Sequence, residues 1–162
     1  MVQSKYLVGI RTNKFDTQSR FLYKYYKSYG MDVVFVYDET SVQTNTSEYI
    51  KLSLNIDFLK NNKLYAGVDK VGWLCGDYCL YLMMIECPAY EGYWLIEDDA
   101  FIRYEDLRAF FEKPIALGVD FLIGRLNRAH KHWKFINACK QYFGISEVFI
   151  ALFRGGSTCL NN

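Results

Sequence analysis

Three consecutive carboxylates, Glu97, Asp98 and Asp99, directly follow the apolar segment Tyr93–Ile96. Carboxylate oxygens suit hard or borderline cations such as Mg²⁺ and Mn²⁺, which keep several waters and also take oxygens from substrate phosphates. Three adjacent like charges are tolerable where a cation lies between them or where they point into water. The triplet therefore predicts either a metal–diphosphate site or a solvated turn between a strand and a helix.

Two segments near the C-terminus have residue types that bind phosphate. The basic loop 126–134 contains His130 and His132, and it could bind a diphosphate or simply be a solvated loop. Arg154 precedes two glycines, whose backbone amides could cradle phosphate; the alternative is a flexible tail. Together with the acidic triplet, these segments give the chain both charges that a metal–diphosphate site requires.

The five cysteines indicate free thiols rather than disulfides. An odd count without a secretory signal suits a reducing compartment, so we expect a cytoplasmic protein. Cys75 and Cys79 are four residues apart, which would place both on one face of a helix. They could form half of a zinc site, but the sequence has no second pair with ligand spacing, and we interpret them as buried structural residues.

Apolar runs and helical periodicity alternate along the chain. Strands are expected at Lys5–Arg11, Asp32–Tyr37, Tyr93–Ile96, Val119–Gly124 and Phe149–Phe153; helices are expected at Asp16–Tyr29, Glu48–Asn61, Gly72–Cys87 and Tyr104–Lys113, the last ending before Pro114. A strand–helix–strand order within about 35 residues is typical of a right-handed βαβ unit. We therefore predict an α/β fold with a mostly parallel sheet flanked by helices.

Composition excludes several classes of protein. The 162 residues suit one domain, and a net charge of +1 argues against a dedicated nucleic-acid binder. The longest apolar stretch, Tyr78–Ile85, has eight residues, whereas a membrane-spanning helix needs about 20, so we expect no transmembrane segment. The N-terminus has no signal-peptide pattern.

The segment Gly72–Lys113 resembles the central part of nucleotide-sugar glycosyltransferases with the GT-A fold. In those families an apolar helix precedes a buried strand that ends in a DXD-type motif, of which EDD is a known variant. The first strand, ending in Arg11-Thr12-Asn13, and the second, ending in Asp38-Glu39-Thr40-Ser41, fit the same pattern. The resemblance covers residues 5–125 and implies a single GT-A-like domain with a short acceptor-side remainder at 126–162.

The resemblance implies roles for individual residues. Asp99, at the third position of the motif, would bind Mn²⁺ or Mg²⁺ together with Asp98, and His132 could supply a further ligand. Donor contacts are expected from eight positions: Arg11, Thr12, Asn13, Asp38, Gly76, Asp77, Glu97 and Asp98. Arg11 could instead snorkel from its strand end, Asp38 could cap a loop, and Asp77 could cap a helix. Glu147 is the candidate general base, although a solvated loop charge is the alternative.

The activity that this resemblance implies is transfer of a hexose from a nucleotide-diphosphate donor, most simply a UDP-sugar, to a carbohydrate, lipid or protein acceptor. The chain is shorter than a usual GT-A domain, so we expect a minimal or truncated member. A non-catalytic module that binds a nucleotide sugar or a partner protein through the same cleft is the alternative. A phosphoacceptor switch domain fits less well, because its acidic residues follow the first strand, where this chain has Arg11-Thr12-Asn13.

Overall fold

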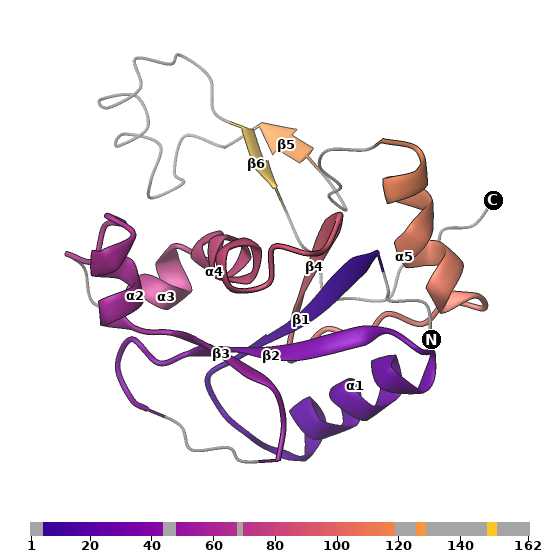
Figure 1. The fold of residues 1–162 in the computed structure, drawn as a ribbon, viewed down its shortest axis with the longest axis horizontal. Coiled ribbons are helices and arrows are strands. Elements are labelled where there is room, and N and C mark those ends of the chain that lie inside the picture. Colours follow the sequence, from indigo (N-terminus) through magenta and orange to yellow (C-terminus); the bar gives the residue numbers. More distant parts are fainter. Residues whose placement is uncertain (1–4, 44–47, 68–69, 119–125, 129–148, 152–162) are drawn as a thin grey trace. The chain divides into compact units, whose positions relative to one another are not determined.

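A computed structural model of the chain describes residues 5–43, 48–67, 70–118, 126–128 and 149–151 (Figure 1). The chain divides into two compact units, residues 1–118 and residues 119–162. In the second unit, strand β5 (Leu126–Arg128) pairs antiparallel with strand β6 (Phe149–Ala151). The predicted strand at Phe149–Phe153 is thus present in its described part, whereas residues 126–128, expected in a loop, form a strand. The predicted strand at Val119–Gly124 lies outside the described residues.

The first unit is built on a four-stranded, all-parallel sheet. Its strands are β1 (Tyr6–Thr12), β2 (Asp32–Asp38), β3 (Lys51–Leu54) and β4 (Gly92–Glu97), in the order β3-β2-β1-β4. The central strand β1 is buried along almost its whole length, as expected for a strand covered on both faces. The predicted α/β class with a parallel sheet is confirmed.

Helix α1 (Thr17–Ser28) connects β1 to β2 and shows why the sequence folds this way locally. The side chain of Asp16 accepts a hydrogen bond from the backbone amide of Ser19, and the Ser19 hydroxyl accepts one from the amide of Asp16, which forms a capping box. The helix ends at Ser28, and Gly30, which follows the C-cap residue Tyr29, has a φ of 73° that is easily adopted only by glycine. These local signals fix the βαβ unit that the sequence predicts.

Helices cover both faces of the sheet. Helix α1 and helix α5 (Leu107–Ala116) pack on one face, where Leu22, Tyr26 and Phe111 join the inward side chains of β1 and β2 in a core. Helices α2 (Ile56–Asn61), α3 (Val71–Leu74) and α4 (Tyr78–Glu86) cover the other face (Figure 1). Because side chains alternate along a strand, each strand end presents consecutive residues to opposite faces.

Three predicted helices differ from the structure. Residues 51–54, expected in a helix spanning Glu48–Asn61, form the edge strand β3, because Leu54 packs into the core and the backbone pairs with β2. The helix expected at Gly72–Cys87 is broken between α3 and α4, at Cys75–Asp77. Pro114 lies inside α5 rather than beyond its end. Proline has no backbone N–H, so the helix loses one hydrogen bond at this position. The buried side chains of Leu107 and Phe111 hold the helix against the sheet despite that loss.

Within the part of the chain that the structure describes, no helix combines the length and apolar character needed to cross a bilayer.

Candidate functional site

The carboxyl ends of three parallel strands bring the predicted site residues to one edge of the sheet. Arg11 of β1 lies beside Glu97 of β4 in register, and Thr12 lies beside Tyr37 of β2, one residue before Asp38. In open parallel sheets ligands bind beyond this edge. The alternation of side chains then divides the cluster, with Arg11, Asp38 and Glu97 on the α3–α4 face and Thr12 and Asp98 on the α1 face.

On the α3–α4 face, Arg11 is held by Glu97 and by the backbone of α3, where a longer hydrogen bond of 3.5 Å reaches the carbonyl oxygen of Trp73. The Nη1 atom of Arg11 lies 2.6 Å from Oε1 of Glu97, and its Nη2 donates a hydrogen bond of 2.7 Å to the carbonyl oxygen of Gly72. The Arg11 side chain is 13% exposed and that of Glu97 is 48% exposed, so the pair is half open to solvent. Burial by itself lowers the pKa of Arg11, but the carboxylate of Glu97 and other nearby groups outweigh it, and the net pKa is raised. The guanidinium is therefore permanently charged and fixed in position.

Asp38 lies against the start of α3. A Cβ atom at Gly72 would overlap the carboxylate of Asp38, so the glycine permits this close approach. The Oδ1 atom of Asp38 also accepts hydrogen bonds from the hydroxyl (2.6 Å) and the backbone amide (3.2 Å) of Thr40. Asp38 thus caps the loop after β2, as one of the two interpretations expected, and its carboxylate stays at the edge of the sheet.

The break between α3 and α4 places Gly76 beside Arg11. A Cβ atom at Gly76 would lie 3.0 Å from Nη1 of Arg11, which makes this backbone part of the wall around the guanidinium. Asp77 occupies the N-cap position of α4, but its side chain makes no capping hydrogen bond and is exposed. The helix-cap interpretation of Asp77 is therefore wrong, and its carboxylate faces solvent.

On the α1 face, Thr12 and Gln18 fix the acidic turn. The Thr12 hydroxyl donates a hydrogen bond of 2.6 Å to Oδ2 of Asp98 and accepts one of 3.1 Å from the amide of Lys14. The side chain of Gln18 donates to the carbonyl oxygen of Asp98 (2.9 Å), and the amide of Asp98 donates to the carbonyl oxygen of Arg11 (3.0 Å). The turn is thus tied to β1 and α1 through main chain and side chains.

The three carboxylates of the triplet point in different directions. Glu97 pairs with Arg11 on one face, Asp98 bonds Thr12 on the other, and Asp99 is exposed in a tight turn that a hydrogen bond from Ala100 to the Glu97 carbonyl closes (3.0 Å). Among the described residues, no three side chains of His, Cys, Asp or Glu form a cluster that could hold a metal.

The remaining predicted residues are exposed or lie outside the described ranges. Asn13 is exposed next to Thr12. His132 and Glu147 lie outside the described residues, as does the Gly-rich segment after Arg154. Cys75 and Cys79 do not share a helix, and burial raises the pKa of Cys79 to about 12, so this thiol stays protonated at neutral pH and is a poor metal ligand.

A buried polar group beside the site was not predicted from the sequence. Glu39, the residue after β2, has a side chain that is 2% exposed; it pairs with Lys51 of β3 at 2.7 Å and accepts a hydrogen bond from Ser53. Next to it, the hydroxyl of Tyr37 is buried without a hydrogen-bond partner among the described residues, and burial raises its pKa. The only feature of the sequence that pointed to this buried group was the acidic pair Asp38-Glu39 at a strand end. Its partners Lys51 and Ser53 could not be predicted, because the segment that forms β3 was expected to be helical.

No family model, no curated protein and no solved structure matches this chain. Its function must therefore be inferred from the residues at this edge of the sheet.

Proposed function

We propose that this chain is a metal-dependent glycosyltransferase that binds a nucleotide-sugar donor, most simply a UDP-sugar, at the carboxyl edge formed by β1, β2 and β4. One observation carries the proposal: three parallel strand ends gather a fixed cation, Arg11, and carboxylates from two different strands at this edge. The GT-A resemblance of Gly72–Lys113 supports the same interpretation.

Each side chain at the edge has a role in this proposal. Asp98 and Asp99 would hold Mn²⁺ or Mg²⁺, and a bound ion of this kind neutralises charge on a leaving diphosphate. Thr12 and Gln18 orient Asp98 for that task, because their hydrogen bonds fix both its side chain and its carbonyl oxygen. Arg11 presents a permanent positive charge to the diphosphate, and Glu97 holds it in place.

The nucleoside is assigned to the β1–β2 side of the edge. Asp38 would accept hydrogen bonds from a base or ribose, with Thr12, Asn13 and the backbone at Gly76 as further contacts. Asp77 is exposed beside Gly76 and could add a polar contact. The general base at Glu147 and the further metal ligand at His132 remain expectations from the GT-A resemblance, because both residues lie outside the described ranges. The acceptor itself is a carbohydrate, lipid or protein.

A cytoplasmic location belongs to the same proposal. Among the described residues, Cys75, Cys79 and Cys87 are free thiols, which suits a reducing compartment.

Calorimetry of UDP binding, with and without Mn²⁺, tests this function. We expect binding to tighten at least tenfold with Mn²⁺, and we expect Asp99→Asn to abolish that difference. Glu105→Gln is the matched control, because Glu105 is also an exposed carboxylate but lies beyond the acidic turn. Failure of every nucleotide diphosphate to bind, with or without the ion, would refute the proposal.

A second measurement separates an enzyme from a binding module. Release of free UDP from a panel of UDP-sugars, with water or simple sugars as acceptors, is expected for the transferase and should disappear in Asp99→Asn. Donor binding without any UDP release would instead favour the non-catalytic nucleotide-sugar-binding module.

A further inference from the structure

The outer side of α1 and the loop after the acidic turn together expose a cluster of aromatic side chains. Phe21 is 54% exposed, Phe101 50% and Tyr29 39%, and the half-buried Tyr25 contacts all three. The ring centre of Tyr25 lies 6.0 Å from that of Phe21, 4.7 Å from that of Phe101 and 5.3 Å from that of Tyr29. We call these four side chains the aromatic ridge. Contiguous exposed apolar surface of this kind marks a site of contact with a partner or a membrane.

Hydrogen bonds hold the loop side of the aromatic ridge in place. The hydroxyl of Tyr25 donates to the carbonyl oxygen of Ile102 at 3.3 Å, and the amide of Ile102 donates to the hydroxyl of Tyr26 at 3.4 Å. Tyr26 is fully buried between α1 and the sheet, so it is a fixed anchor. Because Ile102 follows Phe101 directly, these bonds keep Phe101 against α1 (Figure 1).

Positive charges lie beside the aromatic ridge on α1. The helix contains Arg20, Lys24 and Lys27 and has no Asp or Glu. Lys24 follows Phe21 by three residues and Arg20 by four, so these three exposed side chains are neighbours on the helix surface. Lys27 pairs with Asp32 at 3.8 Å, whereas neither Arg20 nor Lys24 forms an ion pair with any described residue.

Arg103 adds a third positive charge from the loop. It is exposed, and it has no ion pair within the described ranges. Burial and the Tyr29 hydroxyl raise the pKa of Tyr25, and the positive charge of Arg103 acts against that rise, which places Arg103 near the aromatic ridge. The acidic residues of this loop, Asp99 and Glu105, lie outside the segment 100–104, at its two ends.

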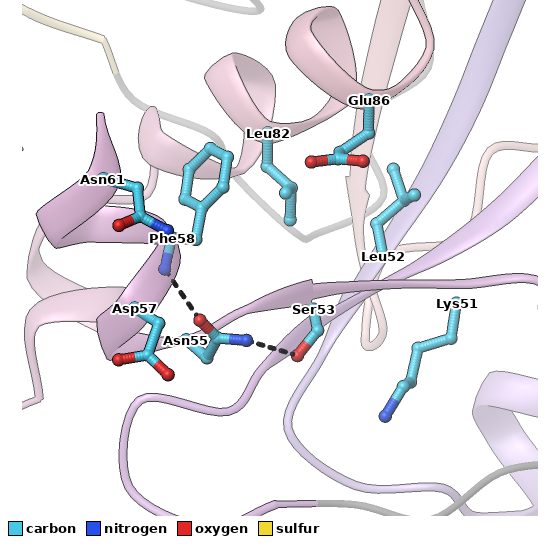
Figure 2. Close-up of a pocket in the computed structure, with 9 residues that line it drawn as sticks. All are labelled: Lys51, Leu52, Ser53, Asn55, Asp57, Phe58, Asn61, Leu82 and Glu86. Carbon is cyan, nitrogen blue, oxygen red and sulfur yellow. Dashed lines mark hydrogen bonds between the residues drawn. The ribbon is translucent and has the colours of Figure 1, made fainter.

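The hollow bordered by β3, α2 and α4 has a different character (Figure 2). Of its apolar side chains, Leu82 is 2% exposed and Phe58 is 9% exposed, so they present almost no surface to a ligand. Its exposed groups include the carboxylates of Asp57 and Glu86. The aromatic ridge, by contrast, combines half-exposed rings with unpaired cations.

This combination of charge and ring packing selects an anionic lipid surface as the partner. A two-fold dimer through the aromatic ridge would bring Arg20 and Lys24 close to the same cations of a second copy, and like charges repel. Stacking on single-stranded nucleic acid needs separate, open ring faces, whereas the rings of the ridge lie against one another. At a bilayer surface, aromatic rings enter the boundary between headgroups and acyl chains, and adjacent Lys and Arg side chains attract anionic headgroups.

We propose that the aromatic ridge, with Arg20, Lys24 and Arg103, docks this protein on a membrane surface that contains anionic phospholipids. The rings of Phe21 and Phe101 enter the headgroup boundary, and the three cations meet the lipid phosphates. This inference goes beyond the proposed function and does not depend on it, since none of these residues is assigned a contact with the nucleotide donor.

Flotation of the full chain with vesicles at low ionic strength tests the charge requirement. The protein should float with vesicles of equal amounts of phosphatidylcholine and phosphatidylglycerol, and it should not float with phosphatidylcholine alone. Each cation removed weakens binding about fivefold, so Arg20→Gln combined with Lys24→Gln should weaken it about 20-fold or more. Lys60→Gln is the matched control, because Lys60 is an exposed, unpaired lysine of α2 among the described residues, and it should change binding less than about twofold. Absence of binding to the anionic vesicles, or an equal loss in the control, would overturn the proposal.

Aromatic variants separate docking by the ridge from general attraction of cations to the vesicle. Phe21→Ala combined with Phe101→Ala should weaken vesicle binding at least about tenfold, whereas Tyr81→Ala, which removes an exposed ring of α4, should leave it unchanged. Circular dichroism verifies that each variant is folded, and the charge variants decide the matter if the aromatic variant is not. Vesicle binding by the folded aromatic variant equal to that of the parent would overturn the proposal. Binding of oligouridylate, or dimer formation in sedimentation velocity, without any vesicle binding would overturn it as well.

Discussion

The contact between Gly72 and Asp38 gives the sharpest test of how the carboxyl edge of the sheet is assembled. Replacing Gly72 with alanine places a methyl group on the carboxylate of Asp38, so the Asp38 side chain must rotate away from its hydrogen bonds to Thr40, or α3 or the end of β2 must move. The carbonyl oxygen of Gly72 accepts the 2.7 Å hydrogen bond from Arg11, and this bond would be strained by the same movement.

The magnitude follows from three contributions. Overpacking a tight site costs about 1–3 kcal/mol, and weakening the Arg11 hydrogen bond costs about 1 kcal/mol. Alanine is better than glycine in a helix by about 0.5–1 kcal/mol, which offsets part of the loss because Gly72 lies within α3. We therefore expect Gly72→Ala to lower the free energy of unfolding by about 1–3 kcal/mol.

Urea denaturation followed by circular dichroism measures this loss, with Gly76→Ala as the matched control. A methyl group at Gly76 would meet only the tip of the Arg11 side chain, at 3.0 Å, and this flexible end can move aside. The control should therefore lose less than about 1 kcal/mol. Adding Asp38→Ala to Gly72→Ala removes the obstructing carboxylate, and the double variant should be more stable than the sum of the two single effects by at least about 1 kcal/mol. Strict additivity, or a Gly72→Ala variant as stable as the parent, would refute the close contact between Gly72 and the carboxylate of Asp38.

Two further predictions concern charged groups that are not among the candidate site residues. Lys51→Met should destabilise the fold by about 2–4 kcal/mol, because it leaves the buried carboxylate of Glu39 without its cation, and the added Glu39→Gln should restore part of the loss in thermal denaturation. For Asp16, the hydrogen bond from the backbone of Ser19 holds the pKa of the carboxyl below its usual value. The charged cap therefore stabilises the protein above about pH 4 and ceases to do so as the pH falls through the lowered pKa. Asp16→Ala should cost about 1 kcal/mol at pH 7 and progressively less toward pH 2, and a loss independent of pH would contradict this role.

Much of the first unit could be predicted from local sequence. The cap at Asp16 and the stop at Gly30 define α1, and the apolar run Asp32–Tyr37 lies within β2. Local signals suffice here because capping groups and continuous apolar runs act within a few residues. The segment around β3 could not be assigned in this way: four residues are too few to distinguish strand alternation from helical periodicity, and only pairing with β2 decides between them.

The residues at the carboxyl edge were also found from sequence, but their partners were not. The acidic triplet and the polar end of β1 can be read from residue type and order. The register of β1 against β4 decides that Glu97 pairs with Arg11 and that Asp98 accepts a hydrogen bond from Thr12. The buried pair of Glu39 with Lys51 depends on β3 in the same way, since residues 12 positions apart meet only once that strand joins the sheet.

The sequence alone thus determined the chemistry available to this protein: the strand–helix–strand order of β1, α1 and β2, and a row of carboxylates after an apolar strand. Tertiary structure decided which groups meet. Side chains alternate along each strand, so carboxylates that are neighbours in the chain lie on different faces of the sheet. The register of the parallel strands then sets the partner of each carboxylate. Glu97, Asp98 and Asp99 are adjacent in sequence, yet one pairs with an arginine, one bonds a threonine and one faces solvent.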